Sequence, residues 1–259
     1  MSIIAFIRYK KSLKTFFGND LFKDGKILWA GHDGVPFSTI SEAWDEVFII
    51  KYPSEKEEKI AINRIAEEND IAECKVLSLN LISPPNLEKL NNMLKSYSKT
   101  SIDMTQTNIR EKANGANADP SFKHLERLME KDKNKAVCIV NLIKVRDLAV
   151  FPDDYKGRKV KKGKPLTGSE VYEKYSSKFM QICGIFGAQF VTIGRVKAVL
   201  FGDDASDWKT FTVVQYPSLN TLLDILSLNE IDLAFANRKA GLEKTKVTIT
   251  NPYDEYFVN

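Results

Sequence analysis

The sequence predicts an α+β fold of two tandem ferredoxin-like units, each with the order strand, helix, strand, strand, helix, strand. Three observations indicate this fold. The segment WDEVFIIKYPS at 44–54 matches WKTFTVVQYPS at 208–218. A strand containing a glycine, Gly31 or Gly194, precedes each match. A helical stretch and one more apolar strand follow each match.

The first unit is the reduced copy, with strands predicted at 3–10, 27–32, 47–52 and 73–82. Its third strand is apolar on both faces, which is typical of a strand covered on both sides. Pro53 ends this strand because proline cannot donate to a sheet ladder. Ser54 and Glu57 then form a capping-box pattern that predicts a helix start. Between the first two strands, residues 11–25 leave room only for a short helix.

The second unit keeps a full first helix. Thr167 and Glu170 form another capping-box pattern, aromatic residues then recur at helical spacing, and Gly187 ends the run. A leucine stripe after Ser218 predicts the second helix, which extends in further turns to Gly241. Strands are predicted at 136–145, 190–195 and 244–252, and a further strand lies within the matched segment 208–218.

The chain therefore divides into three parts. Residues 1–82 form the reduced N-terminal unit, residues 83–135 a helical connector, and residues 136–259 the C-terminal unit. The connector has apolar residues at helical spacing near both ends and a polar stretch at 98–119, which predicts two helices joined by a loop.

Several motifs of the second half resemble one family: NLIKVRD (141–147), FPDDY (151–155), TGSEVYEKY (167–175), IFGAQFVTIG (185–194) and ANRKAGLEKT (236–245). They are similar to the family called domain of unknown function 1330, in the dimeric α/β-barrel superfamily. The resemblance covers residues 121–252 and is weak in the first half. It implies two ferredoxin-like sheets that face each other and close a barrel around a pocket. This chain would form that pseudo-dimeric barrel from its own two units.

The resemblance brings no reaction with it, because the family is uncharacterised. Superfamily relatives include cofactor-free monooxygenases, isomerases and lyases, and haem enzymes. A haem enzyme needs a proximal histidine, and neither His32 nor His124 is an evident ligand. The three cysteines form no CxxC pair. We therefore predict no cofactor and no metal.

Composition limits the location and partners of the protein. No apolar run approaches the ~20 residues that span a bilayer, and the N-terminus is not a signal peptide, so we expect a cytoplasmic protein without a membrane partner. The net charge of +4 does not imply nucleic acid. The basic segment KGRKVKKGK (156–164) is either an anion-binding loop or a solvated one, and its lack of aromatics favours the latter. We expect a monomer or a homodimer.

Two polar residues in apolar settings are candidates for ligand binding. Asn141 interrupts the strand VCIVNLIKV, and a buried amide needs partners. Those partners are a ligand inside the barrel, a neighbouring loop or a buried water. Arg238 follows small and apolar residues on the last helix. It can hold a ligand carboxylate, pair with a carboxylate such as Glu173, or extend to water.

Tyr172, Tyr175 and Tyr216 are candidate walls of the same pocket, although tyrosines at these positions are also ordinary core residues. We expect the larger cavity against the second unit, with the first unit's half shallow or plugged by the connector. The leading hypothesis is small-molecule binding in the barrel cavity. The alternatives are a cofactor-independent enzyme of monooxygenase, isomerase or lyase type, with catalytic residues unknown, and a structural interaction module.

Overall fold

The computed structural model describes residues 1–10, 21–38, 40–107, 122–153, 155–157, 159–161, 163–202 and 207–256. The short helix expected at 11–25 and the polar loop expected at 98–119 fall largely outside these ranges. The strands of the first unit are β1 (Ser2–Tyr9), β2 (Lys26–Pro36), β3 (Trp44–Lys51) and β4 (Ile71–Leu81). Those of the second unit are β5 (Val137–Val145), β8 (Gln189–Phe201), β9 (Thr210–Tyr216) and β10 (Leu242–Pro252).

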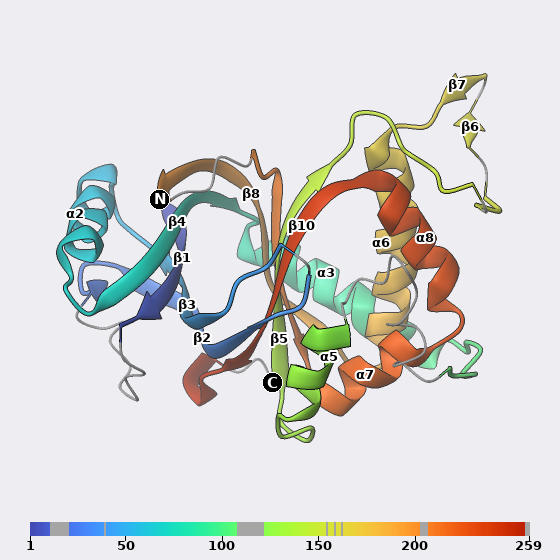
Figure 1. The fold of residues 1–259 in the computed structure, drawn as a ribbon, viewed down its shortest axis with the longest axis horizontal. Helices are drawn as coiled ribbons and strands as arrows, with labels where there is room; N and C mark the ends of the chain where they lie inside the picture. The colour runs from blue at the N-terminus through green and yellow to red at the C-terminus, as the bar shows by residue number, and fades with distance from the viewer. Residues whose placement is uncertain are drawn as a thin grey trace.

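These strands close into a single antiparallel barrel in the order β1-β3-β2-β10-β5-β9-β8-β4 (Figure 1). The first unit contributes β4-β1-β3-β2 and the second contributes β10-β5-β9-β8. In both, the fourth strand of the unit lies beside the first, and the third lies beside the second, which is the ferredoxin-like arrangement. Pairing of β2 with β10 and of β4 with β8 joins the units. The predicted fold class, an α+β pseudo-dimeric barrel within one chain, is confirmed.

The described helices are distributed unevenly over the two units. Helix α2 (Glu55–Glu67) lies beside the first unit. The second unit carries α6 (Gly168–Ile185), α7 (Leu219–Ser227) and α8 (Ile231–Gly241). The connector supplies α3 (Pro84–Ser96), the 3-10 turn Tyr97–Lys99 and α5 (Phe122–Met129). A small hairpin, β6 (Val160–Lys161) and β7 (Lys164–Pro165), projects from the second unit, and a 3-10 turn, Asp254–Tyr256, follows β10.

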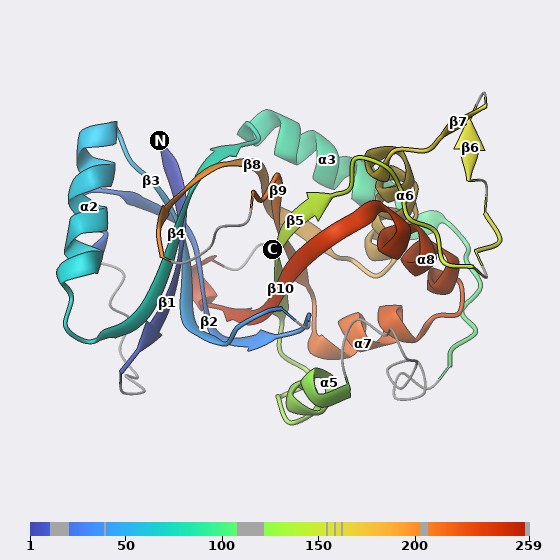
Figure 2. The same ribbon diagram turned by 45° about the horizontal axis from the view of Figure 1, so that its top comes forward.

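The connector packs on the second unit. Leu94 of α3 and Leu125 and Leu128 of α5 are buried in the same apolar cluster as α6, α7 and the outer face of the second sheet. Figure 2 shows α2 at one end of the molecule, with α3, α6, α7 and α8 gathered at the other. The described helices of the connector therefore lie on the second unit. Of the two alternatives expected for the first unit's half, shallow or plugged by the connector, they do not support the plug.

The helix ends follow the local signals of the sequence. Thr167 and Glu170 form the full capping box of α6, in which each side chain bonds the other residue's backbone N–H. Gly187 has φ +76°, a left-handed conformation that favours glycine, and ends the helical run. At α2 the Ser54 hydroxyl accepts from the Lys56 N–H at 3.2 Å and contacts the Glu57 carboxylate. Ser54 is thus a cap, with Glu57 bound to its side chain.

Among the described residues, side chains from both units fill the inside of the barrel. Trp29, Trp44 and Trp208 lie there among aliphatic residues from both units. The void between Lys75 and Lys246 measures about 10 Å³, which is room for about one water molecule. The barrel interior is therefore a shared core, and the expectation of a ligand pocket inside it is wrong.

Candidate functional site

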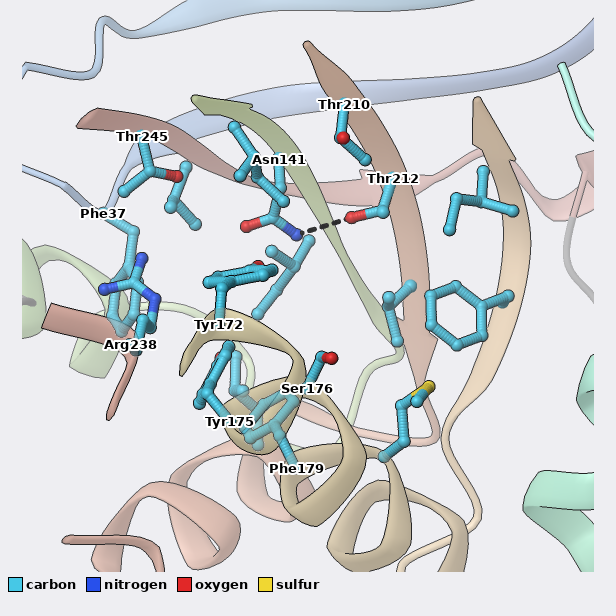
Figure 3. A pocket seen from close by; sticks show the side chains of 18 of the residues that line it. Phe37, Asn141, Tyr172, Tyr175, Ser176, Phe179, Thr210, Thr212, Arg238 and Thr245 are labelled. Atoms are coloured by element: carbon cyan, nitrogen blue, oxygen red, sulfur yellow. Dashed lines mark hydrogen bonds between the residues drawn. The ribbon is translucent and has the colours of Figure 1, made fainter. Parts of the chain in front are cut away.

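A cavity of about 380 Å³ lies outside the barrel wall, between the second unit's sheet and its helices (Figure 3). Its floor comes from β5, β8, β9 and β10, and its cover from α6, α7 and α8. The location follows from the alternation of side chains along a strand. On β5, Val140 and Leu142 face the barrel core, so Asn141 and its neighbours Ile139 and Ile143 face the helices.

All five residues predicted for a binding site line this one cavity. They are Asn141 on β5, Tyr172 and Tyr175 on α6, Tyr216 on β9 and Arg238 on α8. The cavity also lies against the second unit, where we expected the larger one. That these residues bind a ligand stays a prediction.

Asn141 is bonded across the sheet. Its Nδ2 donates to the Thr212 hydroxyl at 3.0 Å, and the two residues are register partners of β5 and β9. Figure 3 shows its carbonyl oxygen directed to the opposite side, toward Tyr172 and Arg238. Asn141 faces the cavity and is half-buried, whereas the residues that precede it in β5 are buried. Its amide thus has a structural partner and still presents an acceptor to the cavity.

Arg238 lies in the last turn of α8 at the edge of the aromatic cover. Its guanidinium carbon is 6.0 Å from the centroid of the Tyr175 ring, a cation–π distance. Tyr172 is close enough to interact with the same charge. Burial raises the pKa of the Tyr172 hydroxyl, and Arg238 opposes that rise. Glu173, a partner considered from the sequence, lies on the exposed side of α6.

The other tyrosines act as walls. Tyr175 stacks against Phe179 and Phe235, with ring centroids 5.3 and 6.1 Å away. Tyr216 is fully buried, and its hydroxyl lies 3.7 Å from the Cys183 sulfur. Burial raises the pKa of the Tyr216 hydroxyl well above its ordinary value. The Tyr216 hydroxyl is therefore not ionised near neutral pH.

Thr212 and Phe37 are two lining residues that were not predicted from the sequence. Thr212 could have been found, since the repeat aligns it with Phe48 of the first unit. Phe37 could not, because it belongs to the first unit and reaches the cavity only after barrel closure. Its backbone N–H donates to the Val247 carbonyl at 2.8 Å, and the next residue, Ser38, donates to the Thr245 carbonyl at 2.9 Å.

The corresponding place in the first unit is filled. Ala5 and Phe48 are register partners of β1 and β3, as Asn141 and Thr212 are of β5 and β9. Phe48 is fully buried, and Phe22 packs on it with ring centroids 5.1 Å apart. The first unit's own aromatic side chains therefore occupy the volume that the second unit leaves open.

Metal-type ligands do not gather anywhere in the described parts of the chain. No group of three or more His, Cys, Asp or Glu side chains there could hold an ion. Cys74, Cys138 and Cys183 are buried free thiols. His32 lies away from the cavity, with Nδ1 2.8 Å from the Asp33 carboxylate. None of the described helices is long and apolar enough to cross a membrane.

Comparison with known proteins gives structural likenesses only. No family model matches the chain, and no curated protein matches it significantly. A protein of unknown function from Rhodopseudomonas palustris is 20% identical, with a TM-score of 0.46, over 52% of this chain and 96% of the other. A putative monooxygenase from Lactobacillus acidophilus is 8% identical, with a TM-score of 0.40, over 97% of this chain and 92% of the other. A mutant chlorite dismutase from Candidatus Nitrospira defluvii is 9% identical, with a TM-score of 0.38, over 98% and 92%. At these values the likenesses assign neither a family nor an activity.

Proposed function

We propose that the protein binds a small, mainly apolar molecule in the cavity between the second sheet and α6–α8. The observation that carries the proposal is the contrast between the two units. The second unit leaves about 380 Å³ open where the first is filled by Phe48 and Phe22. That volume lies in the lower part of the range for ligand pockets. Apolar walls with a few polar groups are also typical of such pockets.

The ionisable groups of the cavity favour binding over acid–base catalysis. Among its described lining residues, the ionisable side chains are Arg238 and the tyrosines Tyr172, Tyr175 and Tyr216. General acid–base catalysis works best with a group whose pKa lies near the working pH. Burial moves the pKa values of Tyr172 and Tyr216 away from neutrality. A cofactor-independent enzyme would therefore have to act through positioning and hydrogen bonding.

The family membership proposed for residues 121–252 is the domain of unknown function 1330 family, and it rests on the motifs of the second half. Two of those motifs belong to elements that line the cavity. The capping box of TGSEVYEKY starts α6, and the segment ANRKAGLEKT runs from α8 into β10. A cytoplasmic location, a monomeric or homodimeric state, the absence of a nucleic-acid partner and the three-part division of the chain remain predictions.

The test measures the binding of a neutral fluorescent probe to the unaltered protein and to a variant whose cavity is filled as in the first unit. N-phenyl-1-naphthylamine should bind the full chain with increased emission. The double variant Asn141→Ala with Thr212→Phe recreates the Ala5 and Phe48 pair of the filled unit. It should keep its melting temperature, and its affinity for the probe should fall by about tenfold or more. Equal affinity in the two proteins would show that the probe binds elsewhere and would refute the proposal. Native mass spectrometry of the freshly purified protein tests in parallel for a retained ligand.

A further inference from the structure

The formal charge among the described lining residues of the cavity is positive. Of the described residues that line it, Arg238 alone carries a formal charge at neutral pH, and no carboxylate lies among them. An anion entering an apolar cavity needs a compensating cation, because its desolvation is otherwise too costly. Low-dielectric walls also strengthen the attraction between opposite charges. The lining therefore favours a negatively charged group on the ligand.

The last turn of α8, which carries Arg238, is fixed from two sides. The Tyr155 hydroxyl donates to Asn237 Oδ1 at 2.5 Å, and the Val150 N–H donates to the Ala240 carbonyl at 2.9 Å. On the other side, Gly241 packs directly against the first turn of α6 at Gly168. A guanidinium held on a fixed backbone loses less freedom when it binds an anion.

Polarity is graded along the strands that form the floor. The row of β5, β9 and β10 nearest the start of α6 contains Thr210 and Thr245, and the next row contains Asn141 and Thr212. The row after that contains Ile139 and Val214, which are apolar. From Thr210 to Val214 the strand rises about 13 Å. Figure 3 shows Arg238 on the same side as Tyr172 and Thr245, so the charge lies at the hydroxyl-rich end.

We propose that the ligand is an amphiphilic organic anion, such as an aromatic or aliphatic carboxylate. This inference rests on the proposed function and specifies its ligand class. The negative group lies against the Arg238 guanidinium, which can donate two parallel hydrogen bonds to it. The apolar body extends along α6 toward Phe179, Met180 and Phe190.

A matched pair of probes tests the charge. 1-anilinonaphthalene-8-sulfonate has the ring system of N-phenyl-1-naphthylamine with one sulfonate added. In Arg238→Gln the affinity for the sulfonate probe should fall by about tenfold or more, while that for the neutral probe changes by less than about twofold. Lys239→Gln is the control, because it removes the same charge from the exposed neighbouring position of α8. It should change neither affinity.

Each other outcome is decisive. An equal loss of both probes in Arg238→Gln would mean that the arginine shapes the cavity, which overturns this inference and leaves the proposed function standing. Binding of the neutral probe alone to the unaltered protein would do the same. Binding of neither probe would overturn both proposals.

A displacement measurement on the unaltered protein tests the same inference without relying on a variant that must fold. Octanoate should displace the bound neutral probe at a lower concentration than octanol does, and equal or better displacement by octanol would contradict the inference.

Discussion

Two side chains decide which unit has a cavity. Asn141 and Thr212 bond each other across β5 and β9, and together they occupy less depth than the aromatic ring of Phe48, which fills the equivalent place. The sequence alone indicates that Asn141 is unusual in its strand. For its partner, Thr212, the sequence gives only the indirect signal of the alignment with Phe48, because the two residues become neighbours through strand pairing. The suggestion that Asn141 points into the barrel is wrong, because it faces the helices outside the barrel wall. Alternation along a strand separates two faces but does not say which face the helices cover.

Glu46 gives the first unit a buried carboxylate of its own. Only 4% of its surface is exposed, and it accepts hydrogen bonds from the hydroxyls of Tyr9 and Tyr253, both at 2.5 Å. Burial raises the pKa of Glu46, although these two bonds and nearby His32 oppose the rise, and Asp45 adds to it. Tyr253 follows β10, so the cluster ties the end of the second unit to the first.

The pH dependence of stability follows from this raised pKa. A carboxyl whose pKa is higher in the folded state binds more protons when folded. Its contribution to stability is therefore complete below the unfolded-state value and is lost as pH rises through the folded-state value. Glu46→Gln has no carboxyl to titrate, so it does not lose this contribution. The free energy of unfolding of Glu46→Gln relative to that of the unaltered protein should therefore increase as pH rises from 4.5 to 8. Urea unfolding at several pH values measures the difference.

Glu55→Gln, at an exposed position of α2, is the control and should show no such trend. A constant difference between Glu46→Gln and the unaltered protein at every pH would mean that the two tyrosine hydrogen bonds balance the cost of burying the charge, so that folding leaves the pKa unchanged. The prediction would then be wrong.

At the scale of elements, the helix starts were the most predictable features. Ser54 and Thr167 each accept a backbone N–H at the head of a helix, as their capping-box patterns indicate, and Ser218 does the same before the helix that the leucine stripe predicts. The crossing of α6 and α8 was not predictable, because it joins residues far apart in the chain. Gly168 and Gly241 allow the two backbones to touch there.

Gly241→Ala should disturb both stability and the cavity. A Cβ at this position would lie 2.6 Å from the Gly168 carbonyl oxygen and 2.8 Å from the Tyr172 nitrogen, which are backbone atoms that cannot rotate away. The two helices must separate, and overpacking of this kind costs about 1–3 kcal/mol. Probe affinity should fall as well, since Tyr172 and Arg238 lie on the separated helices. Thermal unfolding and probe titration measure the two effects.

Lys239→Ala provides the control, because it is exposed on the same helix and should change stability by less than about 0.5 kcal/mol. Unchanged stability and affinity in Gly241→Ala would mean that the contact can relax without moving the cavity walls.

At the scale of the whole molecule, the duplicated strand order made the barrel predictable, and its closure explains what was missed. Phe37 reaches the second unit's cavity only because β2 pairs with β10. The connector covers the second unit because α3 and α5 bury their leucines there. Neither contact has a local signal in the sequence, since both depend on which apolar faces remain uncovered after the sheets have joined.

The shared interior predicts that the two units unfold together. All three tryptophans lie in the barrel core, so their fluorescence reports on the interface between the units. The helices lie outside the barrel and dominate the far-UV circular dichroism.

Leu77, on β4 at the junction with β8, is fully buried in the barrel core. Leu77→Ala should cost about 2–5 kcal/mol and shift the two signals by the same amount. Met93→Ala, on the exposed side of α3, should shift neither. Separate transitions for fluorescence and circular dichroism would mean that each unit is stable alone, and the barrel core would then be an interface between independent domains.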